Sequence, residues 1–65
     1  MEAPAPIIRT RVFRNRTITV IATWTPAYGL WSVIRKVDGK LVEVLATPTD
    51  PALHVQRLID KGIGD

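Results

Sequence analysis

The chain has 65 residues, a formal net charge of +3 and a sequence pI near 10.0, and 46% of its residues are hydrophobic. A chain of this length forms one domain, near the size at which an apolar core only just outweighs chain entropy. The absence of cysteine excludes a disulfide framework and a thiolate metal site.

The hydropathy of the chain and its N-terminal residues indicate the cellular location of the protein. No run of about 18 apolar residues is present, so we expect no membrane span and no membrane partner. Residues 1–6 lack the basic start and apolar core of a secretory signal, which makes the cytoplasm the expected location. Their alternating Ala and Pro residues predict a flexible, extended tail before a single small α+β domain over 7–65.

Charge is unevenly distributed along the sequence. Residues 1–40 carry seven basic and two acidic side chains, whereas residues 41–65 carry two basic and four acidic ones. The basic portion is also the part rich in β-branched residues. A high pI with clustered basic residues is compatible with binding to nucleic acid or another polyanion.

The first hairpin is predicted from strands over 7–13 and 17–25, which are rich in Ile, Val and Thr. The even positions of the second segment are apolar, and Arg9 and Arg11 occupy odd positions of the first. Keeping both arginines away from the core requires a connection of three or five residues, with Asn15 at positive φ. Arg9 and Arg11 would then share the outer face with Thr17, Thr19 and Thr23.

The second hairpin, over 28–45, turns at Asp38-Gly39, a dipeptide that favours a two-residue type I′ turn. This turn predicts that Val37 pairs with Lys40 and Val33 with Val44. Two faces result. One is mostly apolar and holds Trp31 and Val33, and the other is mixed and holds Leu30, Ser32, Ile34, Lys36, Leu41, Glu43 and Leu45.

A C-terminal helix follows, with Asp50 as its N-cap and Pro51 as its first residue. Gly62 is the expected C-cap, with Ile63 packing behind it. The apolar side of the helix is predicted to consist of Ala52, Val55, Leu58 and Ile59. The element order is therefore β-β-β-β-α: a four-stranded antiparallel sheet of two hairpins, with one helix packed on one face.

One helix covers only one face of such a sheet, because a helix is about 10 to 12 Å wide and strands lie about 4.8 Å apart. An uncovered apolar face on a small protein usually marks an interface. We therefore expect a homo-oligomer or a protein partner. The interface residues would be Ile21, Leu30, Ile34, Leu41 and Leu45, or the Trp31 and Val33 set if the helix takes the other side.

Basic residues of the first hairpin are the most suggestive binding feature. The predicted nucleic-acid-binding residues are Arg9, Arg11, Arg14, Arg16, Arg35, Lys36 and Tyr28, the last as a stacking aromatic. The alternative is that the arginines protect an edge strand from pairing with another chain. Trp24 and Trp31 are expected to belong mainly to the core.

The sequence carries no recognisable catalytic constellation. Its acidic residues are accounted for by turn, cross-strand, cap and surface positions, and His54 is a lone histidine on the helix. No glycine-rich phosphate loop, nucleophile motif or metal-ligand spacing is present. We therefore expect a non-enzymatic protein without a cofactor or a bound metal.

The run from Gly29-Leu30-Trp31 through Asp38-Gly39-Lys40 to Pro51-Ala52-Leu53 resembles two known architectures in the order of its elements. One is the arm-type DNA-binding domain of phage-type tyrosine recombinases, and the other is the small archaeal chromatin proteins. Both resemblances imply a basic sheet followed by a helix, without carrying over any residue role.

The first expectation for function is a small module that binds DNA or RNA through its basic N-terminal hairpin. The alternative is an inhibitor or accessory protein of phage or mobile-element type, which would bind a protein through the uncovered sheet face. A purely structural homo-oligomer is the third reading.

Overall fold

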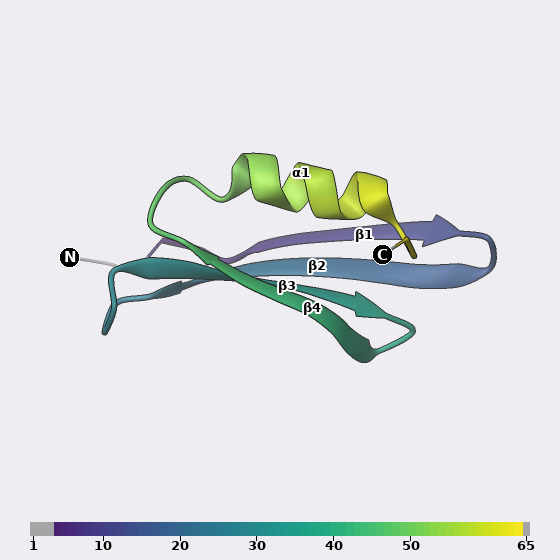
Figure 1. Cartoon of the computed structure of the whole chain (residues 1–65), viewed down its shortest axis with the longest axis horizontal. Coiled ribbons are helices and arrows are strands. Elements are labelled where there is room, and N and C mark those ends of the chain that lie inside the picture. Colours follow the sequence, from purple (N-terminus) through teal and green to yellow (C-terminus); the bar gives the residue numbers. More distant parts are fainter. Residues whose placement is uncertain (1–3, 65) are drawn as a thin grey trace.

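The computed structural model describes residues 4–64 and consists of one sheet and one helix (Figure 1). The elements are β1 (Ile7–Phe13), β2 (Arg16–Thr25), β3 (Leu30–Val37), β4 (Lys40–Thr47) and α1 (Ala52–Lys61). The strands form an antiparallel meander in the order β1-β2-β3-β4, and α1 lies across one face of it. This confirms the predicted fold class.

Both ends of the described chain lie outside the sheet. Residues 4–6 of the predicted tail are exposed and have no regular secondary structure, and residues 1–3 of that tail lie outside the described residues. Within residues 4–64, no helix has the length and apolar character needed to cross a membrane.

The core lies between α1 and the two central strands. Its fully buried apolar residues alternate along β2 and continue into β3 and the helix: Ile18, Val20, Ala22, Val33, Val55 and Leu58. The period of two along β2 and the period of 3.6 along α1 direct these side chains toward one another. Ile59 packs at the edge of this cluster, whereas Ala52, also predicted for the apolar side of the helix, is exposed.

The predicted register of the first hairpin is wrong. The connection is a two-residue turn, Arg14-Asn15, in which both residues have positive φ (52° and 63°). Arg11 therefore pairs with Ile18, and Arg9 with Val20, so both arginines lie on the helix-covered side of the sheet. The outer face instead receives the even-numbered residues of β1, which are Ile8, Thr10 and Val12.

Arg11 is tolerated on the covered side because β1 is an edge strand and the helix ends beside it. Its Nη1 atom donates to the carbonyl oxygens of Ile59 at 3.0 Å and Asp60 at 3.3 Å. Carbonyls in the last turn of a helix lack intrahelical partners, and a cation there also interacts favourably with the helix dipole. The alternation pattern predicted solvent exposure for Arg11, and the helix end supplied a partner instead.

The second hairpin turns at Asp38-Gly39 as predicted, with φ of 51° and 83°, and Val37 pairs with Lys40. The predicted register continues through the next pair, Lys36 with Leu41, and is wrong beyond it, because the register shifts between Arg35 and Lys36. A bulge places one extra residue on β4 and exchanges the faces of the residues that follow. Val33 consequently pairs with Leu45 instead of Val44, and Glu43 lies opposite Arg35.

The helix starts one residue later than predicted. Pro51, not Asp50, is the N-cap, and Ala52 is the first helical residue. Asp50 lies one position before the cap, where its Oδ1 atom accepts a hydrogen bond from the Ala52 N–H at 2.9 Å. At the other end, Gly62 has φ of 64° and donates its N–H to Ile59 and Leu58 carbonyl oxygens. Ile63 then packs against the core, as predicted.

Candidate functional site

The two hairpin turns lie at the same end of the sheet, and the C-terminal end of α1 lies there too (Figure 1). We call this region the turn end. Within residues 4–64, seven basic residues belong to it, against three acidic ones, Asp38, Glu43 and Asp60. The basic residues are Arg11, Arg14, Arg16, Arg35, Lys36, Lys40 and Lys61. The fold thus gathers positive charge that the sequence spreads over fifty positions.

Asp38 holds the two turns in a fixed relation. Its Oδ1 atom accepts a hydrogen bond from the Thr17 N–H at 3.0 Å, and its Oδ2 atom lies 3.3 Å from Nη1 of Arg16. The Asp38 N–H in turn donates to the Thr17 carbonyl oxygen at 2.9 Å. The exposed ion pair contributes little stability on its own, but with the backbone bonds it orients one turn against the other.

The first turn displays its cations around an aromatic ring. The guanidinium carbon of Arg14 lies 5.0 Å from the centroid of Phe13, and that of Arg11 lies 4.8 Å from it. Cation–π contacts of this kind restrict a flexible side chain without neutralising its charge. Arg14 is exposed, so it presents a partly ordered positive charge to solvent.

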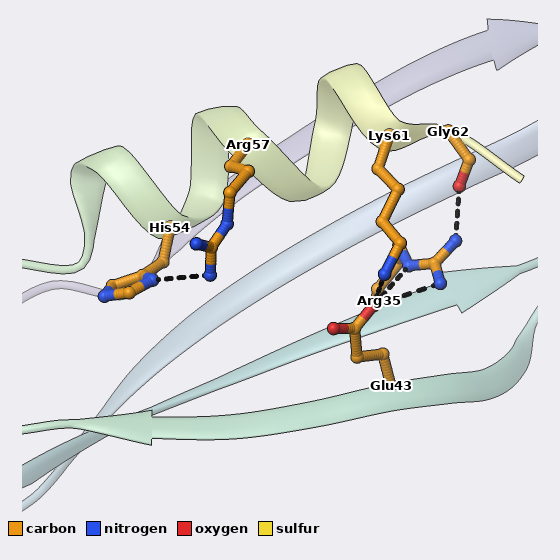
Figure 2. Close-up of polar contacts among 6 residues, drawn as sticks. All are labelled: Arg35, Glu43, His54, Arg57, Lys61 and Gly62. Atoms are coloured by element: carbon orange, nitrogen blue, oxygen red, sulfur yellow. Dashed lines mark hydrogen bonds and ion pairs between the residues drawn. The ribbon is translucent and has the colours of Figure 1, made fainter. Parts of the chain in front are cut away.

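A partly buried ion cluster lies at the turn end, between β3, β4 and α1 (Figure 2). Arg35 is only 4% exposed, and its Nη2 atom lies 3.1 Å from Oε1 of Glu43. The same carboxylate oxygen accepts from Nζ of Lys61 at 3.0 Å. The Nη1 atom of Arg35 donates to the carbonyl oxygen of Gly62. Together with Arg11, Arg35 thus satisfies carbonyls at the end of α1.

Glu43 is ionised in this cluster. The hydrogen bond from Lys61 has the largest effect and lowers the pKa of Glu43 below its ordinary value of 4.5, and Arg35 lowers it further by hydrogen bonding and charge. Partial desolvation acts in the opposite direction but is outweighed. The carboxylate therefore remains the counter-ion of two cations at neutral pH.

A groove of about 570 Å³ opens beside the cluster, between the end of α1 and the β3–β4 hairpin. Its lining is mixed. Val37, Val42 and Ile63 contribute apolar surface, and Arg16, Arg35, Glu43 and Lys61 contribute charge. Each of these charged side chains already has an ion-pair partner. The charged side chains of the groove are therefore engaged within the protein, and the groove is not the strongest candidate for binding.

The remaining cations are the ones available to a ligand. The ion pairs formed within residues 4–64 involve Arg16, Arg35 and Lys61, and they leave out Arg14, Lys36 and Lys40. Arg14 and Lys40 are exposed on the two neighbouring turns, and Lys36 is half-buried one strand position away from the second turn. Lys40 was missed by the sequence argument, although its place directly after Asp38-Gly39 on a turn is a signal for exposure.

Other predicted binding residues lie elsewhere. Arg35 is buried and has a structural role, so it is not part of an exposed basic surface. Arg9 is exposed in the middle of β1, and its Nη1 atom donates to the Ile8 carbonyl oxygen. Tyr28 is 78% exposed in the β2–β3 turn, at the opposite end of the sheet. The arginines and Tyr28 therefore do not form one site.

The predicted interface residues divide between the two faces. Ile21, Leu30, Ile34 and Leu41 lie on the uncovered face, with Leu41 paired to Lys36. Leu45 lies on the covered face and packs against the core, because the bulge in β4 reverses its direction. Trp24 and Trp31 also face the helix side, half-buried and 5.7 Å apart in an edge-to-face pair.

Side chains suited to metal binding or acid–base chemistry are dispersed. Residues 4–64 contain no group of three or more His, Cys, Asp or Glu side chains placed to hold a metal ion. His54 lies on α1, where its Nδ1 atom is 3.1 Å from Nη2 of Arg57 (Figure 2). The arrangement as a whole is suited to electrostatic contact with a partner.

Comparison with known proteins adds no family. No protein-family model matches the chain, and no curated protein or solved structure matches it significantly. The resemblance to recombinase arm domains and archaeal chromatin proteins therefore remains one of element order.

Proposed function

We propose that the protein binds nucleic acid through the turn end. The observation that carries the proposal is the excess of four positive charges that two hairpin turns and one helix end gather there among the described residues. Neutralising backbone phosphates releases condensed counterions, which is the main source of affinity for proteins of this kind. The exposed Arg14 and Lys40 make the first contacts.

The spacing of the turns supports contact with a phosphate backbone. Adjacent strands lie about 4.8 Å apart, so the β1–β2 and β3–β4 turns are separated by roughly 10 Å. This separation is comparable to the width of the DNA major groove, about 12 Å. Arg14 on one turn and Lys40 on the other can therefore reach phosphates on opposite sides of a groove. The Asp38 contacts keep the turns in this relation.

A double substitution at the two turns tests the proposal. Arg14→Ala with Lys40→Ala should weaken binding to a short fluorescent DNA duplex and reduce the slope of log affinity against log salt by about 2. Fluorescence anisotropy at several salt concentrations measures both quantities. A single strand and an RNA duplex of matching sequence show which nucleic acid is preferred.

The matched control removes the same charge elsewhere. Arg9→Ala with Arg57→Ala deletes two exposed cations that lie away from the turns. This variant should keep a salt slope close to that of the wild type. Equal losses in both double variants would show that binding follows net charge alone, and salt-independent or undetectable binding of the wild type would refute the proposal.

A further inference from the structure

The uncovered face of the sheet carries a row of aliphatic side chains that crosses all four strands. Ile8 pairs with Ile21, Ile21 with Ile34, and Ile34 with Val44, so one residue of each strand contributes. We call these four residues the aliphatic row. Ile8 is 55% and Val44 60% exposed, while the two central members are half-buried. All four are β-branched residues, which pack well on a pleated surface.

The rows on either side are mainly hydroxyl-bearing. Thr10 pairs with Thr19 toward the turn end, and Thr23 pairs with Ser32 on the other side. Among the described strand residues whose pairing places them on this face, Lys36 is the only charged one. The other charged strand residues at paired positions lie on the side of α1. Charged strand residues thus lie mainly on the covered face, whereas the polar residues of the uncovered face are mostly uncharged hydroxyl side chains.

We propose that the aliphatic row is the centre of an interface with a second copy of this chain. A surface almost free of charge meets its own copy without like-charge repulsion, as a twofold interface requires. The available area reaches the smallest size of a specific interface when the whole face takes part. Four strands of about 25 Å in a sheet about 20 Å wide give roughly 500 Å² of projected face per copy, or about 1,000 Å² for two, which is the lower limit for a specific interface.

The positive charge at the turn end favours one orientation of the second copy relative to the first. Rotating the second copy about an axis along the row places the two turn ends at opposite ends of the dimer, whereas rotation about an axis along the strands brings them side by side. The first arrangement keeps the two excesses of positive charge apart. It also stacks Val44 on Val44 of the second copy and places Lys36 over Ser32, because these two residues flank Ile34 on β3 at equal distances.

Substitution at an exposed row residue tests the interface. The wild type should have twice the chain mass of 7.2 kDa by sedimentation equilibrium at high micromolar concentration. Val44→Glu should give a folded monomer, because the new carboxylates would be buried against each other at the twofold axis. Leu53→Glu is the matched control, since Leu53 is 83% exposed on α1, and it should remain a dimer.

Cross-linking tests the orientation, since the chain has no natural cysteine. Val44→Cys should be joined to its counterpart by a short bismaleimide, because packed sheets are about 10 Å apart and beyond disulfide reach. Leu53→Cys should not be joined. A wild-type monomer at all concentrations, a Val44→Glu dimer, or a dimer that Val44→Cys fails to cross-link would overturn the proposal, as would assembly only in the presence of nucleic acid or another protein.

Discussion

The two faces of the sheet differ in the number of charged side chains that they carry. On the covered face, Arg35 and Glu43 lie beneath the end of α1, and Arg11 reaches the same helix end from β1. On the uncovered face, threonines and β-branched aliphatics surround a single lysine, Lys36, among the described paired residues. Arg11 and Arg35 both donate to backbone carbonyls at the end of α1, where carbonyls lack a full set of intrahelical partners. Some basic residues of this chain, Arg11 and Arg35 among them, therefore stabilise the fold.

The largest predicted effect is on the free energy of unfolding, when a buried and an exposed leucine of α1 are each replaced by alanine. Leu58→Ala should lower the free energy of unfolding by about 3 kcal/mol, because Leu58 is 1% exposed and its truncation leaves a cavity. Leu53→Ala, on the opposite side of the same helix, should change it by less than about 0.5 kcal/mol. Urea unfolding followed by tryptophan fluorescence measures both. Equal losses would contradict the assigned packing of α1.

Arg35 and Lys36 are adjacent in sequence and lie on opposite faces of the sheet. Replacing each by alanine therefore compares the stability that a basic residue contributes on the covered and on the uncovered face. Arg35→Ala should cost about 2 kcal/mol, since it removes charged hydrogen bonds to Glu43 and the Gly62 carbonyl. Lys36→Ala should cost less than about 0.5 kcal/mol. Thermal unfolding of the two variants at equal concentration distinguishes the roles. A greater loss for Lys36→Ala would reverse the assignment of faces.

The smallest predicted effect is the pH dependence contributed by Glu43. Its pKa is lower in the folded state than its ordinary value of 4.5, chiefly because of Lys61. Its stabilising contribution is therefore fully present above about pH 4.5 and is lost as the pH falls through the folded-state pKa. Glu43→Gln should lose less stability than the wild type between pH 6 and pH 3. Parallel pH profiles of the unfolding midpoint measure the difference, and coincident profiles would argue against the ion cluster.

The approximate helix and strand boundaries could be predicted from the sequence, because they depend on the backbone preferences of a few neighbouring residues. Asp38-Gly39, Asp50-Pro51 and Gly62 specify a turn, a helix start and a helix end through backbone preferences of the residues themselves. The registers depended on tertiary contacts. Arg14-Asn15 forms a two-residue turn that alternation alone disfavoured, because the end of α1 offers Arg11 a partner. The bulge in β4 had no comparable signal and moved Leu45 to the covered face.

The candidate binding site was predictable only in part. The sequence placed Arg14 and Arg16 in or beside a hairpin loop and gave Lys36 as a further candidate, but it could not place Tyr28 at the far end of the sheet or bury Arg35. Which turns share an end follows from the meander order, and which cations remain unpaired follows from side-chain contacts. The place of Lys40 directly after Asp38-Gly39 indicates its exposure, whereas its lack of an ion-pair partner among the described residues follows from the structure.

An amide chemical-shift map of the protein titrated with a short DNA duplex distinguishes nucleic-acid binding at the turn end from binding at the aliphatic row. Binding through the turn end should give shifts concentrated at the two turns, around Arg14, Arg16 and Lys40, and should leave the aliphatic row unchanged if a second copy covers it. Shifts centred on Ile8, Ile21, Ile34 and Val44, with the turns unaffected, would contradict binding through the turn end.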